Sequence, residues 1–215
     1  NIKSRFLSFV QIGVTGMNRI ITIGREFGSG GRELGRRLAD ALQFAYYDRE
    51  IVTELARRTS LSEEYVQRIV EHRPTAAFPI HVGRSFYPMV NPMWEQGQAV
   101  YQEQHRLIKE MAAASSCVIV GRCADYILRD MRPFRIFVYA DMASKMRRCR
   151  EKGEDAKAMS DKELTQHIND INKGRAKYYE FYSGQEWGGR LNYDLCVNTT
   201  QLDLGEVVAA IAKLF

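Results

Sequence analysis

A glycine-rich loop between a predicted strand and a predicted helix carries the clearest chemistry in this sequence. The apolar, β-branched run from Ile20 to Ile23 predicts the strand, and leucines four apart from Leu34 predict the helix. Between them lie these positions: Arg25, Gly28, Ser29, Gly30, Gly31 and Arg32. Such a loop directs backbone N–H groups and the positive end of a helix dipole at one place, which favours a bound phosphate. The alternative is a tight turn that binds nothing, and the flanking arginines favour phosphate.

Polar side chains also follow three other predicted strands. Asp48 ends the short aromatic run that begins at Phe44, Arg122 follows the apolar run 117–120, and Asp141 follows the run 134–139. In open α/β sheets, ligands bind at the carboxyl ends of the strands. We therefore expect the glycine loop, two carboxylates and an arginine to share one edge of the sheet.

Two of these side chains have competing interpretations. Arg122 offers a planar fork that matches phosphate oxygens, and the alternative is a structural ion pair at the sheet edge. Asp48 is suited to bind a sugar hydroxyl or a basic side chain, or to cap a helix that begins near Glu50. The sequence pattern alone leaves these alternatives open.

A third arginine interrupts an apolar helical stripe. The stripe runs four, three, four, three and four residues apart through Leu164, Ile168, Ile171, Arg175, Tyr178 and Tyr182. A cation on an inward stripe needs a partner. The pattern leaves two possibilities open: Arg175 pairs with a carboxylate in the core, or it faces a cleft that holds a phosphate.

The helix predicted after Asp141 places Met142, Met146 and Cys149 inward and puts three cations on a different face: Lys145, Arg148 and Lys152. A solvated charged surface is the ordinary interpretation of such a face, and a lid over a phosphate is the alternative. The charged stretch 150–160 predicts a solvated loop. We therefore place a lid at about 150–162.

The elements that must position these residues alternate between strand and helix. Helices are predicted over 31–42, twice between Asp48 and Val70, and over 93–114, 160–182 and the C-terminus; three openings carry capping signatures, at Ser60/Glu63, Ser160/Glu163 and Asp203/Glu206. A fifth strand is predicted over 193–197, and residues 72–92 predict a long irregular segment. Apolar strands alternating with helices predict a parallel sheet covered on both faces.

Composition narrows the class of protein. Of the 215 residues, 45% are hydrophobic and 27% charged, which is ordinary for a globular domain. The formal charge of +5 comes without a basic stripe, so we expect no nucleic-acid partner, and no apolar run is long enough for a membrane span. The four cysteines and four histidines lack metal-ligand spacing. We expect a cytoplasmic protein with reduced cysteines and no protein-bound metal, and we exclude residues 1–16 as a leader or extension.

Taken together, the segments Gly24 to Glu33, Val120 to Arg122 and Gly174 to Arg175 resemble the cytidylate kinase-like family within the P-loop nucleoside monophosphate kinases. The resemblance covers 17–215 as a single domain. It implies a P-loop NTPase-like α/β fold with a five-stranded parallel sheet, helices on both faces, an acceptor-side flap at about 49–98 and the lid. It also implies transfer of the γ-phosphoryl group of ATP, with Mg²⁺, to CMP or dCMP.

The resemblance assigns roles to individual residues of this chain. The donor-phosphate loop falls on Gly28, Ser29, Gly30 and Gly31. Arg122 becomes the monophosphate ligand, Asp48 lies at the start of the acceptor region, and Arg148 and Arg175 become lid arginines on the transferring group.

One departure from the P-loop pattern affects the expected activity. In G-x-x-x-x-G-K-[ST], the lysine bridges donor phosphates. Counted from Gly24, the lysine and hydroxyl positions fall on Gly30 and Gly31; aligned on the glycines, Gly31 takes the lysine position. Arg32 is then the candidate replacement, and loss of one such charge can cost ~10²–10³-fold in rate. Three hypotheses stay open: a cytidylate kinase-type enzyme, a nucleotide-binding regulatory protein without turnover, and a kinase for a non-nucleotide acceptor.

Overall fold

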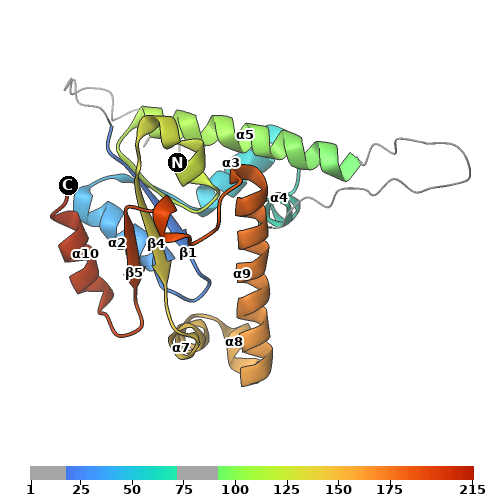
Figure 1. Ribbon diagram of the computed structural model, residues 1–215. Helices are drawn as coiled ribbons and strands as arrows, with labels where there is room; N and C mark the ends of the chain where they lie inside the picture. The colour runs from blue at the N-terminus through green and yellow to red at the C-terminus, as the bar shows by residue number, and fades with distance from the viewer. Residues whose placement is uncertain (1–17, 72–91) are drawn as a thin grey trace, which may run out of the picture.

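Five parallel strands form the sheet at the centre of the molecule (Figure 1). The computed structural model describes residues 18–71 and 92–215. The sheet order is β2-β3-β1-β4-β5, with these bounds: β1 Ile20–Arg25, β2 Ala45–Tyr47, β3 Cys117–Val120, β4 Phe134–Tyr139 and β5 Leu195–Asn198. β1 pairs through Ile23 with Val120 of β3 and Ile136 of β4. The predicted parallel sheet is confirmed, and β1 lies at its middle.

Helices cover both faces of this sheet (Figure 1). On one face lie α2 (Gly31–Leu42) and α10 (Leu204–Ala212). The other face is covered by α3 (Arg49–Thr59), α4 (Glu63–Glu71), α5 (Pro92–Ala114), α6 (Ala124–Ile127) and the C-terminal part of α9 (Asp161–Ser183). The remaining elements are α7 (Met142–Lys152), α8 (Glu154–Ala158) and the 3₁₀ turns η1 (Arg129–Met131) and η2 (Arg190–Asn192).

The apolar strands are buried on both sides, and their side chains divide between two cores. In β1, Ile20 joins the core under α3 and α5, whereas Ile21 and Ile23 join the core under α2 and α10. Successive side chains of a strand point to opposite faces. This is why β1 reads as a continuous apolar run rather than as an alternating one.

Two of the three predicted helix caps are confirmed, and one is wrong. Ser160 and Glu163 form a reciprocal capping box at the start of α9, and the Asp203 side chain accepts from two backbone N–H groups of α10. Ser60 instead ends α3 with a left-handed φ of 56°. Ser62 takes the capping role, since its Oγ accepts from the Tyr65 N–H at 3.3 Å. The chain needs Ser60 to turn between the two helices, so the cap falls two residues later.

The predicted solvated loop at 150–160 is also wrong. α7 continues to Lys152, α8 begins at Glu154, and the extended Gly153 between them breaks the helix. Glu154 and Asp155 stand in the first turn of α8, where acidic side chains complement the helix dipole. The charges of this stretch therefore belong largely to helix surfaces.

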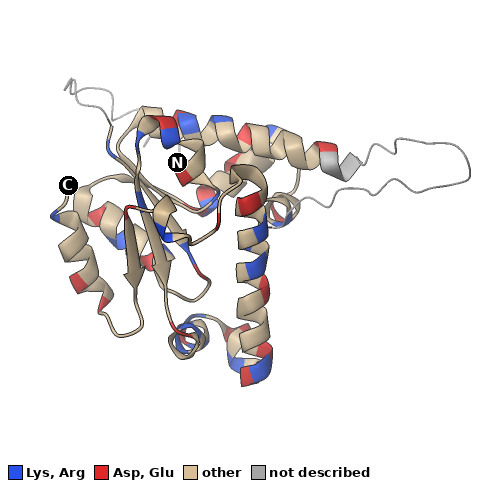
Figure 2. Ribbon diagram, viewed as in Figure 1, with Lys and Arg blue, Asp and Glu red and all other residues tan. Residues whose placement is uncertain are grey.

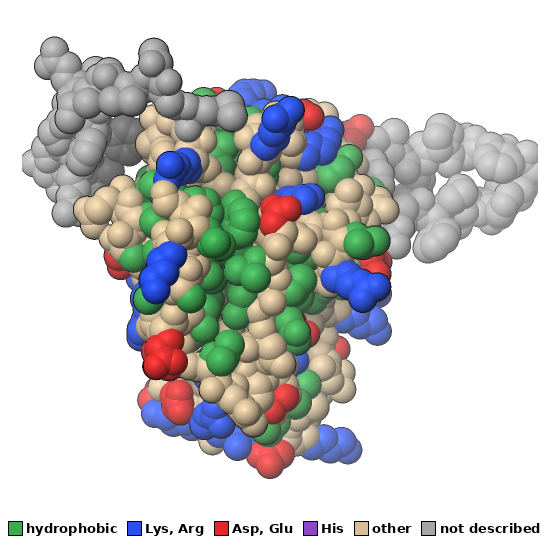
Figure 3. Space-filling model, turned by 60° about the vertical axis from the view of Figure 1, so that its left-hand side comes forward, with side chains coloured by type: hydrophobic (Ala, Val, Ile, Leu, Met, Phe, Trp, Pro, Cys, Tyr) green, Lys and Arg blue, Asp and Glu red, His purple; other side chains and the backbone are tan. Residues whose placement is uncertain are grey.

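The surface mixes apolar and charged side chains. On the face drawn in Figure 3, apolar side chains gather near the centre, with Lys, Arg, Asp and Glu toward the edges. Within residues 18–71 and 92–215, no helix is long and apolar enough to cross a membrane. The expectations for residues 1–16 and 72–91 concern parts of the chain that lie outside the described residues.

Candidate active site

The loop between β1 and α2 takes a path that requires its glycines. Gly28 and Gly30 have φ values of 76° and 84°, in the left-handed region. A Cβ on Gly31 would lie 2.5 Å from Arg25 Cβ, so this position has no space for a side chain. The loop leads directly into the N-terminus of α2, whose first N–H groups lack intrahelical partners. This is the geometry of an anion site at a helix N-terminus.

Ser29 is fully buried and holds the loop from inside. Its hydroxyl donates to the Glu26 carbonyl at 2.9 Å, and its own carbonyl accepts from the Thr199 hydroxyl at 2.6 Å. These hydrogen bonds of Ser29 therefore fix the shape of the loop, which also contains Gly28, Gly30 and Gly31.

Ion pairs connect this loop region to two neighbouring elements. Arg32 Nε lies 2.6 Å from Asp48 Oδ2, which joins the first turn of α2 to the end of β2. Lys145 Nζ lies 2.9 Å from Glu26 Oε2 and joins α7 to the loop. The prediction that Lys145 belongs to a solvated face is wrong, because its side chain is only 8% exposed. Figure 2 shows the cations gathered on α7.

Arg25, the last residue of β1, extends its guanidinium across the carboxyl edge of the sheet. A Cβ on Gly121 would lie 1.8 Å from Arg25 Nη1, so the guanidinium packs on that glycine. Its nearest described carboxylate oxygen is Asp48 Oδ1, at 3.9 Å. Burial, followed by repulsion from Arg175 and Arg122, holds the pKa of Arg25 well below its usual range. Among the described residues, three arginines and the Asp48 carboxylate therefore set the charge at this edge.

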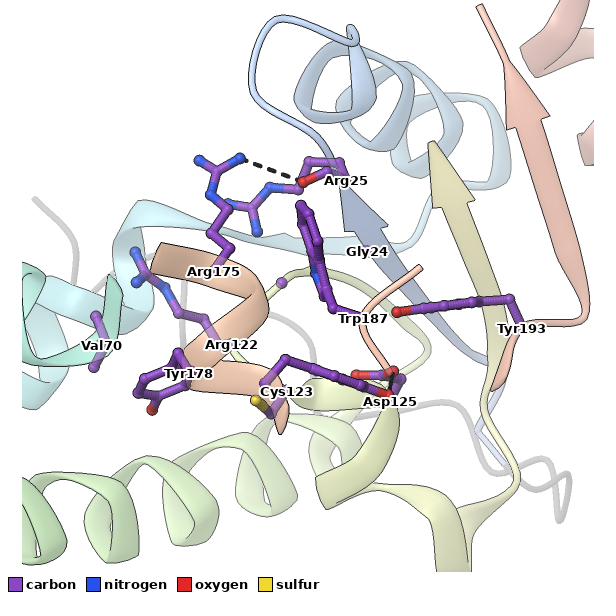
Figure 4. A pocket seen from close by; sticks show the side chains of 12 residues that line it. Gly24, Arg25, Val70, Arg122, Cys123, Asp125, Arg175, Tyr178, Trp187 and Tyr193 are labelled. Atoms are coloured by element: carbon purple, nitrogen blue, oxygen red, sulfur yellow. Dashed lines mark hydrogen bonds between the residues drawn. The ribbon is translucent and has the colours of Figure 1, made fainter. Parts of the chain in front are cut away.

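Two further arginines, Arg122 and Arg175, lie near Arg25 at this edge of the sheet (Figure 4). Arg175, from α9, donates from Nη1 to the Arg25 carbonyl at 3.3 Å. Arg122 follows β3 with a φ of 59° and is 7% exposed; its Nη2 donates to Gln67 Oε1 at 3.0 Å. The structure thus places Arg175 beside Arg122, the arginine that the sequence placed at this edge.

Arg148 reaches the other side of the loop from α7. Its Nη2 donates to the Thr199 carbonyl at 2.5 Å, and a Cβ on Gly30 would lie 3.8 Å from its Nε. Its buried Nη1 has no hydrogen-bond partner among the described residues. Arg148 therefore presents an unused donor beside the glycine loop.

Two cavities meet at the arginines. The larger, which we call the loop pocket, has a volume of about 560 Å³ and is lined by the glycine loop with residues of α2, α7, α8 and α9, among them Gly28, Gly30, Gly31, Arg32, Arg148 and Asp155. The smaller, the arginine pocket, has a volume of about 40 Å³ and is lined by residues that include Gly24, Gly121, Arg122, Asp125, Tyr178 and Tyr179. Arg25 and Arg175 line both cavities.

The arginine pocket also contains a buried acid. The Tyr179 hydroxyl donates to Asp125 Oδ2 at 2.7 Å. Burial raises the pKa of Asp125, and the Tyr179 hydrogen bond opposes this only in part. Asp125 therefore adds little negative charge to offset the arginines at pH values below its raised pKa.

The sequence identified most of the side chains around these cavities but not all of them. Arg122 lines the arginine pocket at the sheet edge where it was expected, and Asp48 lies at the same edge, paired with Arg32. Of the two possibilities left open for Arg175, it takes the place beside a cavity, whereas Asp141 caps α7 through the Ser144 N–H at 2.7 Å. The residues that sequence reasoning passed over are Glu26, Gln67, Asp125 and Tyr179, and Arg25 was noted only as a flanking charge. The position of Arg25 just past the end of a predicted strand was the one signal in the sequence that could have placed it in the site.

The fold is an α/β sheet of five parallel strands with a glycine loop after its central strand, and it is shared with solved structures of other proteins. The structure is similar to shikimate kinase from Bacteroides thetaiotaomicron, with a TM-score of 0.55 at 16% identity over 91% of this chain and 97% of that chain. TT1252 from Thermus thermophilus gives a TM-score of 0.52 at 16% identity, covering 93% of this chain and 100% of that one.

A more similar structure is that of an uncharacterized protein from Eubacterium ventriosum, with a TM-score of 0.66 at 26% identity over 92% of this chain and 98% of that chain. No match was found among curated protein sequences. The model of the cytidylate kinase-like family matches residues 20–201, and the chain belongs to the cytidylate kinase-like family. Family and fold support a phosphotransferase.

Proposed function

We propose that this protein transfers the γ-phosphoryl group of ATP to CMP, dCMP or a similar nucleoside monophosphate. The observation that carries the proposal is that Arg25 and Arg175 line both cavities. Phosphoryl transfer needs a donor and an acceptor held in line, with charge stabilised between them. The loop pocket then takes the donor phosphates and the arginine pocket takes the phosphate group of the acceptor.

The charge of the arginine pocket favours an acceptor that is itself an anion. Three arginines, Arg25, Arg122 and Arg175, line it together with one acid, Asp125. The oxygen of a phosphate monoester is already anionic and needs no strong base, so catalysis is positioning and charge neutralisation. Arg122 binds the acceptor phosphate, and Arg148 and Arg175 stabilise the charge that spreads over the transferring group.

Magnesium would be held by few protein ligands. Residues 18–71 and 92–215 contain no group of three or more His, Cys, Asp or Glu side chains arranged for a metal. Magnesium at such sites is typically bound by one or two carboxylates plus phosphate oxygens and waters. Asp48 fits that role, because its buried Oδ1 accepts no hydrogen bond from a described residue. When bound, the ion supplies neutralisation of donor-phosphate charge.

The test incubates the purified full-length chain with ATP, Mg²⁺ and each nucleoside monophosphate in turn, and measures diphosphate formation. We expect turnover with CMP or dCMP and a KM for the acceptor that rises ~10–100-fold in Arg122→Ala, the cost of one charge-assisted contact. Arg129→Ala, which removes an arginine stacked on Tyr126 away from both cavities, is the matched control.

The missing loop lysine favours a second candidate, a nucleotide-binding regulatory protein. Tight nucleotide binding in calorimetry without any turnover would support this candidate and exclude the first. Turnover with a neutral hydroxyl acceptor, but with no monophosphate, would instead assign the chain to the kinases of non-nucleotide small molecules.

A further inference from the structure

The position of the P-loop lysine is closed in this protein. Gly31 stands at that position in the glycine-aligned register. A Cβ there would lie 2.5 Å from Arg25 Cβ, 3.1 Å from Arg25 Cγ and 3.2 Å from Val138 Cβ. The Cβ and Cγ atoms of Arg25 therefore occupy the space that the first atoms of a side chain at position 31 would need.

The head of Arg25 lies on a second glycine from another part of the chain. A Cβ on Gly121 would fall 1.8 Å from Nη1 and 2.8 Å from Cζ. Gly121 also has a φ of 74°, which disfavours other residues there. The two glycines, from the start of α2 and the end of β3, together leave a channel that the Arg25 side chain fills.

The charges around Arg25 make it a cation that an anion would stabilise. Asp48 approaches it only to 3.9 Å and is engaged more closely by Arg32, at 2.6 Å. Arg122 and Arg175 are near enough to repel it. A phosphate bound at the junction of the two cavities would supply the negative charge that Asp48, at 3.9 Å and engaged by Arg32, supplies only in part.

Arg32, the replacement suggested by the sequence, is placed differently. Its side chain is 49% exposed, pairs with Asp48 and lines the loop pocket only. The Arg25 side chain is 11% exposed and lines both cavities.

We infer that Arg25, rather than Arg32, is the catalytic cation that binds the transferring phosphoryl group in place of the P-loop lysine. The inference rests on the proposed function. It deepens that function by naming a phosphate ligand supplied from the end of β1, across Gly31 and Gly121. No proton transfer is required of Arg25: as the bond from the γ-phosphorus to the donor oxygen breaks and that to the acceptor oxygen forms, it neutralises charge.

The test compares Arg25→Gln, Arg25→Lys and Arg32→Gln in the full-length protein, with Arg37→Gln as a surface control on the same helix as Arg32. We expect Arg25→Gln to lower kcat by ~10²–10³-fold, Arg25→Lys to recover at least tenfold of that loss, and Arg32→Gln to lower kcat less than tenfold. Thermal unfolding is followed for each variant. A folded Arg25→Gln enzyme with kcat within threefold of the unsubstituted protein overturns the inference.

A double variant separates charge from packing. Arg25→Gly removes the Cβ that lies 2.5 Å from the Cβ position of Gly31, so Gly31→Lys in the same chain can supply the charge from the other side. We expect Arg25→Gly/Gly31→Lys to exceed Arg25→Gly in kcat by at least tenfold, whereas Gly31→Lys alone clashes with Arg25. If the unsubstituted chain has no turnover, the proposed function has failed. Calorimetry with ATP then still tests Arg25, and equal Kd values for the Arg25→Gln and unsubstituted chains overturn its assignment as a phosphate ligand.

Discussion

Lys145 Nζ lies 2.9 Å from Glu26 Oε2, and this ion pair fixes α7 against the glycine loop. Glu26 Oε2 also accepts from the Ala140 N–H at 3.3 Å, so one carboxylate oxygen joins the loop, the end of β4 and α7. The Lys145 backbone contributes as well, since a Cβ on Gly28 would lie 2.8 Å from its carbonyl oxygen. The loop is therefore shaped by α7 as much as by its own glycines.

Removing the ammonium should loosen that connection. In Lys145→Ala we expect the free energy of unfolding to fall by about 1–3 kcal/mol, because Glu26 is left partly buried without its cation. We also expect KM for ATP to rise, because the loop loses its support. Urea unfolding and steady-state kinetics measure the two effects.

Lys157→Ala is the control, since it breaks an exposed pair with Glu154 on α8 and should change stability by less than about 0.5 kcal/mol. Equal effects of the two substitutions would contradict the role given to Lys145.

The sequence predicted the loop and the edge of the sheet well, because both follow from local patterns. Strand, glycines and helix are adjacent in the chain, and the carboxyl ends of parallel strands meet by topology. The position of Arg25 could not be predicted in the same way. It depends on the absence of a Cβ at Gly31 and at Gly121, two positions far apart in the sequence that meet only in the folded sheet.

Errors in the prediction have the same origin. The apolar spacing of α7 placed Lys145 outward, yet the partner that buries it, Glu26, comes from the loop after β1. Likewise, Ser60 has the right spacing to Glu63 for a cap, but the turn between α3 and α4 uses Ser60 for its left-handed backbone. Tertiary contacts and chain reversal, rather than local propensity, decided both positions.

Gly28→Ala should damage the loop through both backbone strain and a close contact. Its φ of 76° costs an L-residue about 1–2 kcal/mol, and the new Cβ would meet the Lys145 carbonyl at 2.8 Å and Cys149 Sγ at 3.0 Å. We expect a loss of stability larger than the strain alone, together with weaker ATP binding, measured by urea unfolding and calorimetry. Gly184→Ala isolates the strain, because Gly184 has a φ of 67° and nothing within 4 Å of its Cβ position. The prediction fails if the two variants lose the same stability.

The buried Asp125 should make stability depend on pH in an unusual direction. Burial raises its pKa in the folded protein above the usual value of about 3.9. A carboxyl group with a raised pKa contributes fully below its unfolded pKa, and that contribution is lost as pH rises through the folded value. Asp194 behaves oppositely: its hydrogen bond from Arg135 lowers its pKa, so its contribution is present above the usual pKa and is lost as pH falls.

Asp125→Asn and Asp194→Asn therefore form a pair of opposite sign. Asparagine at 125 carries no charge to bury, so the free energy of unfolding of Asp125→Asn, minus that of the unsubstituted protein, should rise from pH 4 toward neutral. For Asp194→Asn the same difference should fall as pH rises toward about 4 and stay nearly constant above it, because Asp194 has a lowered pKa and its ion pair with Arg135 is complete above the usual pKa of a carboxyl group. Urea unfolding at several pH values measures both differences. A difference for Asp125→Asn that stays flat or falls with pH would show that Asp125 is ionised in the folded protein without penalty, and that Tyr179 offsets its burial completely.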